Sequence, residues 1–264
     1  MCRGVFSFHH LTLDRAFHIG NFEFKPTELF GQKIVNGYED GKENEVFCLI
    51  GPKRYDAPWK DLEQGGFIAS VECIEVRVPM SDELSRTYMN SSKRARYRLA
   101  CENPQKTDVL TALLRKHEGR RILIIGLYIS QLQKLSKKLN VPFIHGKMPN
   151  EEREELYDAF RRGEVPVLII SKVGNFAIDL PDANVAIQIS GTFGSRQEEA
   201  QRLGRILRPK SDGSMSKFYS LTSENTVDQE YAEKRQRFLT ERGYYYELVN
   251  AEQILNDNNV CTDY

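Results

Sequence analysis

The sequence lacks a net charge, clustered cysteines and long apolar runs, and each absence excludes a class of protein. Its 37 Lys and Arg residues balance 37 Asp and Glu residues, so nucleic acid could be contacted only through a local basic patch. The five cysteines show no C-x-x-C spacing, which argues against a metal site or a disulfide framework and favours a cytoplasmic location. No apolar run approaches the roughly 18 residues of a membrane span, so no membrane partner is expected.

Short β-rich runs alternate with longer helical patterns from residue 71 onward. Strands are predicted at residues 72–78, 122–126, 142–145, 165–171, 185–190 and 217–221. Helices are predicted at residues 82–100, 105–116, 130–139, 150–162, 196–207 and 225–242. Apolar runs such as ILII and VLII are typical of strands buried on both faces. The pattern therefore predicts an α/β fold with a doubly wound parallel sheet, whose ligands bind at the carboxyl ends of the strands.

Residues 197–208, QEEAQRLGRILR, carry a polar face on a predicted helix. Three side chains share this face at spacings of i, i+4 and i+7: Gln201, Arg205 and Arg208. Two planar, permanent cations aimed the same way suit a polyphosphate during γ-phosphoryl transfer, as arginine fingers do. The alternative is an exposed helix whose arginines pair with neighbouring glutamates.

The pattern Q-x-x-G-R-x-x-R at residues 201–208 resembles motif VI of superfamily-two helicases. The longer run GSRQEEAQRLGRILRPK is similar to the XPB-type DNA helicases, particularly their bacterial branch. Residues 121–132 and 171–190 resemble motifs IV and V of the same family, and the three motifs follow the family's order. This resemblance, which spans about residues 39–249, implies the second RecA-like motor domain of an ATP-dependent 3′-to-5′ DNA helicase or translocase.

The sequence contains no phosphate loop of the form G-x-x-x-x-G-K-[ST]. Its one Asp-Glu pair, Asp82-Glu83, lacks the residues that follow in the family's acidic Mg²⁺ box. The resemblance therefore implies that a first motor domain, in cis or in trans, completes the ATP cleft. ATP with Mg²⁺ is expected to bind only then, and the chain alone is expected to be inactive as an ATPase.

The resemblance also implies a division of the chain. Residues 1–70 are predicted to be a leader and a remnant of the link from the first motor domain. Residues 71–249 are predicted to form the helicase C-terminal domain, and residues 250–264 a flexible tail.

Four further residues take their predicted roles from the resemblance. It implies that Gln201 and Asp179 bind the nucleotide, with Asp179 contacting the ribose, and that Ser171 and Lys172 contact DNA. Asp179 could instead cap the turn before a proline, and Ser171 could cap the turn that follows its strand.

Residues 86–121 hold ten Lys or Arg residues against three acids. Within them, residues 86–104 match the place of the family's thumb-like DNA-gripping segment. Four cations there are predicted to bind DNA phosphates in single-stranded, duplex or forked DNA: Lys93, Arg94, Arg96 and Arg98. A solvated helix face is the alternative. For the whole chain, the competing hypothesis is a non-catalytic DNA-binding or partner-docking module that retains the helicase fold.

Overall fold

The computed structural model describes residues 71–171, 183–191, 215–241 and 244–257, together with two short strands near the amino terminus. The chain divides into two units, residues 1–56 and 57–264. In the first unit, β1 (Phe17–Ile19) pairs antiparallel with β2 (Phe22–Phe24).

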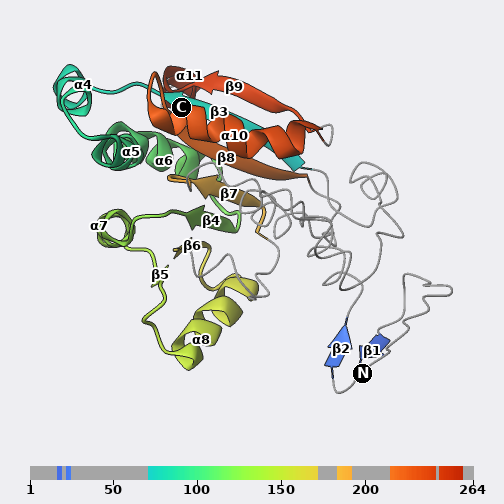
Figure 1. Cartoon of the computed structure of the whole chain (residues 1–264). Coiled ribbons are helices and arrows are strands. Elements are labelled where there is room, and N and C mark those ends of the chain that lie inside the picture. Colours follow the sequence, from blue (N-terminus) through green and yellow to red (C-terminus); the bar gives the residue numbers. More distant parts are fainter. Residues whose placement is uncertain are drawn as a thin grey trace, which may run out of the picture. The chain divides into compact units, whose positions relative to one another are not determined.

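The second unit is built on a parallel sheet in the order β5-β6-β4-β7-β8-β3-β9 (Figure 1). Its strands are β3 (Val71–Val78), β4 (Ile122–Ile125), β5 (Phe143–Ile144), β6 (Val167–Ile170), β7 (Val185–Gln188), β8 (Ser216–Ser223) and β9 (Tyr246–Asn250). Every strand pair in this sheet is parallel. The first six strands lie where the apolar runs predicted them, so the predicted α/β doubly wound sheet is confirmed.

Helices follow the strands and cover the sheet. They are α4 (Asp82–Met89), α5 (Lys93–Cys101), α6 (Gln105–Lys116), α7 (Ile129–Leu139), α8 (Asn150–Arg161), α10 (Val227–Glu241) and α11 (Ala251–Asp257). Successive side chains of a strand point to opposite faces. Ile74 and Val76 of β3 pack with α6 and α11 in the main apolar core, whereas Glu75 between them meets Gln236 of α10. The helices α10 and α11 therefore lie on opposite faces of β3 (Figure 1).

The single helix predicted at residues 82–100 is wrong, because the structure has two helices there, α4 and α5. The break falls at Asn-Ser-Ser, residues 90–92, whose short polar side chains compete for backbone hydrogen bonds. Ser91 Oγ donates to the Thr87 carbonyl, 2.7 Å away. Arg96 of α5 reaches back and donates to the carbonyls of Tyr88 and Met89, so the end of α4 is capped from the next helix.

The predicted flexible tail at residues 250–264 is wrong for its first part. Strand β9 adds a parallel edge to β3, and α11 follows it immediately. Ala251 and Ile254 of α11 are buried in the main core, which explains why this segment is fixed on the domain. None of the helices in the described part of the chain has the length and apolar character to cross a membrane.

Candidate functional site

The carboxyl ends of β4, β6 and β7 lie side by side at one edge of the sheet. In the strand register, Ile125 lies beside both Ile170 and Gln188, so these three strands end together. Ser171 follows β6 directly and is only 2% exposed. Its backbone N–H donates to the Ile144 carbonyl at 3.1 Å, whereas its hydroxyl has no hydrogen-bond partner among the described residues.

Ser190, two residues beyond β7, connects three segments at this edge. Its hydroxyl accepts from the Leu127 backbone N–H at 2.8 Å and donates to Gln131 Oε1 at 3.1 Å. The Gln131 side-chain amide in turn donates to the Cys101 carbonyl at 2.7 Å. The exit of β7 is thus tied to the loop after β4 and to the end of α5. Gln131 was not predicted as a site residue, because its partner is distant in sequence.

Gly191, the next residue, is contacted by two buried side chains. The Tyr97 hydroxyl of α5 donates to the Gly191 carbonyl at 2.7 Å. Burial raises the pKa of Tyr97, which keeps this hydroxyl protonated and able to donate. On the other side, a Cβ added at Gly191 would overlap the guanidinium carbon of Arg235. The absence of a side chain at Gly191 therefore allows the Arg235 guanidinium of α10 to lie this close to the chain.

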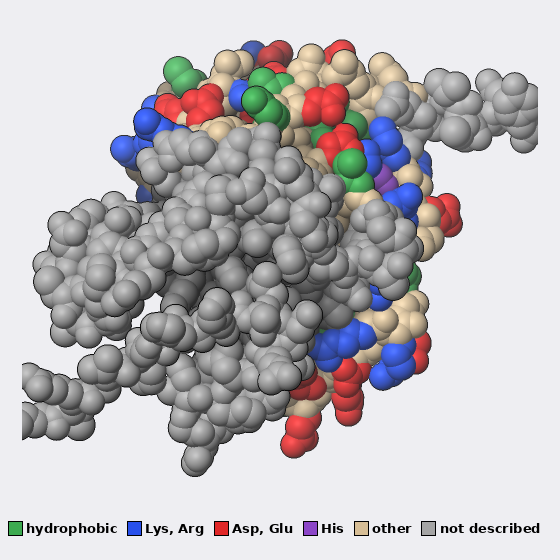
Figure 2. Space-filling view, turned by 90° about the vertical axis from the view of Figure 1, so that its right-hand side faces the viewer, with side chains coloured by type: hydrophobic (Ala, Val, Ile, Leu, Met, Phe, Trp, Pro, Cys, Tyr) green, Lys and Arg blue, Asp and Glu red, His purple; other side chains and the backbone are tan. Residues whose placement is uncertain are grey.

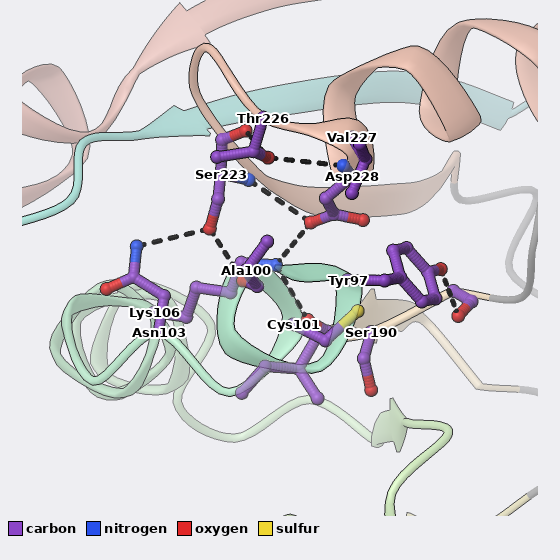
Figure 3. A network of polar contacts seen from close by, with 12 residues as sticks. Tyr97, Ala100, Cys101, Asn103, Lys106, Ser190, Ser223, Thr226, Val227 and Asp228 are labelled. Atoms are coloured by element: carbon purple, nitrogen blue, oxygen red, sulfur yellow. Dashed lines mark hydrogen bonds and ion pairs between the residues drawn. The ribbon is translucent and has the colours of Figure 1, made fainter. Parts of the chain in front are cut away.

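Lys106 was counted in the predicted basic patch, and the structure shows that it does not belong there. Lys106 is completely buried, and its Nζ lies 2.7 Å from Asp228 Oδ2 and donates to the Ile189 carbonyl at 3.2 Å (Figure 3). Asp228 Oδ2 also accepts from the backbone N–H of Ser223. The pair therefore joins α6 to the first turn of α10 and contributes no positive charge to the surface.

The four cations predicted to bind DNA fall into two groups. Arg96 caps α4, and Arg98 pairs with Glu102 at 3.1 Å and lies over the Tyr128 ring. Lys93 and Arg94 are exposed in the first turn of α5, which contains no acidic residue. On the face shown in Figure 2, basic and acidic side chains are interspersed among the described residues, without one continuous positive area. The first turn of α5 is therefore the stronger candidate for a phosphate contact.

Five predicted site residues and one predicted helix lie outside the described residues. They are Lys172, Asp179, Gln201, Arg205 and Arg208, with the helix at residues 196–207. Their roles stay predictions.

The seven-stranded parallel sheet with helices on both faces is consistent with an α/β fold of the RecA-like class. Among solved structures, the C-terminal domain of the DEAD-box protein Dbp5 matches with a TM-score of 0.52 and 18% identity, over 70% of this chain and 97% of that chain. Dbp5 of S. cerevisiae bound to RNA and ADP BeF3 matches with a TM-score of 0.52 and 15% identity, over 86% of this chain and 60% of that chain. At these identities the likeness supports the fold alone.

The particular family follows from the sequence comparison. The model of the ERCC3/RAD25/XPB C-terminal helicase matches residues 62–263, and the chain belongs to this family. It is 54% identical over 217 residues to the DNA 3′-5′ helicase XPB of Mycobacterium tuberculosis, covering 82% of this chain and 40% of that protein. It is 41% identical over 217 residues to the general transcription and DNA repair factor IIH helicase/translocase subunit XPB/SSL2 of Saccharomyces cerevisiae, covering 80% of this chain and 26% of that protein. The predicted resemblance to the bacterial XPB branch is confirmed, and the chain spans about 40% of the length of its bacterial relative.

Proposed function

We propose that this chain acts as the second motor half of an ATP-dependent XPB-type translocase or helicase that moves 3′-to-5′ on DNA. The observation that carries the proposal is the 54% identity to a DNA 3′-5′ helicase over 217 residues, which are 82% of this chain. A first motor domain, in cis or in trans, would complete the ATP cleft, because the 264 residues contain no phosphate loop.

In this proposal, two arginines act on the triphosphate. Arg205 and Arg208 would place their guanidinium groups against the γ-phosphate and stabilise the charge of the transition state. Gln201 would hold the nucleotide beside them, and Asp179 would accept a hydrogen bond from a ribose hydroxyl. The phosphate loop and the Mg²⁺ that binds the phosphates would belong to the first motor domain.

DNA would bind along the same edge of the sheet and at the start of α5. Ser171, at the end of β6, and Lys172 would contact the DNA backbone. Lys93 and Arg94 add positive charge at a helix N-terminus, where the helix dipole also favours an anion. Opening and closing of the cleft between the two motor domains would then step the protein along one strand.

The proposed role of Arg205 and Arg208 as arginine fingers is tested in a protein that contains both motor domains. Arg205→Ala or Arg208→Ala should lower kcat of ATP hydrolysis by about 10³-fold while the affinity for DNA stays nearly unchanged. Arg→Lys at either position should rescue only part of the loss, since lysine cannot form the planar fork.

If the kcat of an alanine variant stayed within a few-fold of the parent's, that arginine would instead be an exposed residue that pairs with a neighbouring glutamate. If neither arginine mattered, the chain would fit better as a non-catalytic DNA-binding or partner-docking module. The absence of a phosphate loop from its sequence is the observation that favours that second function.

A further inference from the structure

Gly191 is the last described residue before the segment that leads to Gln201, Arg205 and Arg208. Two different helices hold it. Tyr97 of α5 donates to its carbonyl at 2.7 Å, and Arg235 of α10 packs against the position that a side chain would need. The chain is therefore contacted from two helices at Gly191, ten residues before Gln201 in the sequence.

Both contacting side chains are buried and have further contacts within the domain. Tyr97 is 1% exposed, and its ring meets that of Tyr231 edge-on, with the ring centroids 4.9 Å apart. Arg235 is also 1% exposed, and its Nη2 lies 3.9 Å from Asp228 Oδ1. Asp228 is in turn fixed by the buried ion pair with Lys106 at 2.7 Å. Moving either contact away from Gly191 would disturb this buried, charged network.

We propose that Tyr97 and Arg235 are positioning residues for phosphoryl transfer, because they fix Gly191 and hence the start of the arginine-bearing segment. The proposal rests on the function proposed above, in which Arg205 and Arg208 act on the γ-phosphate. Catalytic groups must be placed accurately, and a misplacement of about 1 Å can cost on the order of 10²-fold in rate. A single hydrogen bond at the base of the segment can therefore affect turnover without touching the substrate.

Helix α5 carries both the Tyr97 contact with Gly191 and the proposed DNA contact. Lys93 and Arg94 precede Tyr97 by four and three residues, so they lie one helical turn away on a neighbouring part of the α5 surface. DNA bound at the first turn of α5 would thus contact the same helix whose Tyr97 hydroxyl donates to Gly191. The Tyr97 contact with Gly191 is therefore expected to affect DNA-stimulated ATP hydrolysis more strongly than basal ATP hydrolysis.

The decisive variant is Tyr97→Phe, which removes the hydroxyl and keeps the ring against Tyr231. In the two-domain motor it should lower the DNA-stimulated kcat by about tenfold, while KM for ATP and Kd for DNA stay within about twofold. In the full chain alone, amide hydrogen exchange should become faster in peptides covering residues 192–208 and stay unchanged in β8. Gly191→Ala should lower kcat as well, since its methyl group would displace Arg235.

Tyr219→Phe is the matched control. Tyr219 of β8 is also buried, and its hydroxyl lies 2.9 Å from His117 Nε2, outside the group of side chains that contact Gly191. This variant should leave kcat and the exchange of residues 192–208 unchanged. Equal losses of kcat in the two Tyr→Phe variants would show a general effect on stability and would overturn the proposal.

The failures of the two proposals are distinguishable. The positioning role alone would be overturned if Tyr97→Phe kept the kcat and the amide hydrogen exchange of the parent while Arg208→Ala lost most of its kcat. Parental turnover in both Arg205→Ala and Arg208→Ala would overturn the proposed function. The exchange measurement would then still decide whether Tyr97 fixes the chain at Gly191.

Discussion

Buried ionisable side chains in this domain are stabilised in two different ways. Lys106 and Asp228 stay buried as a close ion pair that also uses backbone hydrogen bonds. His117 is 7% exposed and lies among positive neighbours, and its Nε2 is 2.9 Å from the Tyr219 hydroxyl. Burial and, next, the charge of Lys217 lower its pKa to about 4. Burial of Lys106 and Asp228 is tolerated because each neutralises the other, whereas burial of His117 is tolerated because its imidazole is neutral.

The lowered pKa of His117 predicts a loss of stability in acid. The folded state binds a proton at His117 less readily than the unfolded state does, so its contribution is complete above the ordinary histidine pKa, near 6.5. It is lost as pH falls from about 6.5 through about 4. Between about pH 7 and pH 4.5 the free energy of unfolding should fall by about 2 kcal/mol from this residue alone.

Urea unfolding of the parent and of His117→Gln at these two pH values measures this contribution. The glutamine amide can still reach the Tyr219 hydroxyl but does not titrate. The variant should therefore lose less stability in acid than the parent. An equal loss in both proteins would show that other groups cause the acid sensitivity.

The elements of the fold differ in how far the sequence predicted them. The central strands were predictable because ILII and VLII are apolar on both faces, which two layers of helices require. The split between α4 and α5 was missed, since its capping by Arg96 depends on a tertiary contact. Strand β9 was missed because apolar and polar residues alternate only weakly in YELVN, and because this segment continues a helical pattern. Its place in the sheet is decided by pairing with β3.

The candidate site was predicted in outline for similar reasons. Its position at the carboxyl edge follows from strand order and from the motifs. The burial of Lys106 and the intramolecular partners of Arg96 and Arg98 depend on residues brought together only by folding. A count of charges along the sequence could not separate these cations from Lys93 and Arg94.

The first turn of α5 is predicted to carry DNA affinity. The double variant Lys93→Glu with Arg94→Glu should weaken binding to duplex and forked DNA. It should also reduce the slope of log K against log salt by roughly 1.5 to 2, as expected for two lost phosphate contacts. Fluorescence anisotropy across a salt series measures both quantities. Arg96 and Arg98 are left unchanged, because they hold α4 and Glu102.

A double reversal on α8 and its C-cap provides the control for charge. Arg161 and Arg162 pair with Asp158 at 2.5 Å and Glu164 at 2.7 Å, so their reversal changes the net charge equally at an acidic site. Arg161→Glu with Arg162→Glu should leave DNA affinity nearly unchanged. If it weakened binding as much as the α5 variant, the helix α5 would be an ordinary solvated face.

At the scale of the whole molecule, balanced charge and a RecA-like sheet fit a motor half that binds its ligands at one edge. The 37 basic and 37 acidic residues give no general attraction to DNA, so affinity must come from a local site. The chain belongs to the XPB C-terminal helicase family and spans about 40% of its bacterial relative. Its proposed chemistry therefore depends on residues that a first motor domain would contribute.

The most direct test of this account is DNA-stimulated ATP hydrolysis by the purified chain, alone and with a first motor domain of the XPB type. The chain alone should hydrolyse ATP no faster than background, because its sequence offers no phosphate loop to hold the β- and γ-phosphates. Addition of the first domain should produce turnover that Arg208→Ala removes. Robust Mg²⁺-dependent turnover by the chain alone, abolished by Arg208→Ala, would contradict the account and require a nucleotide site within these 264 residues.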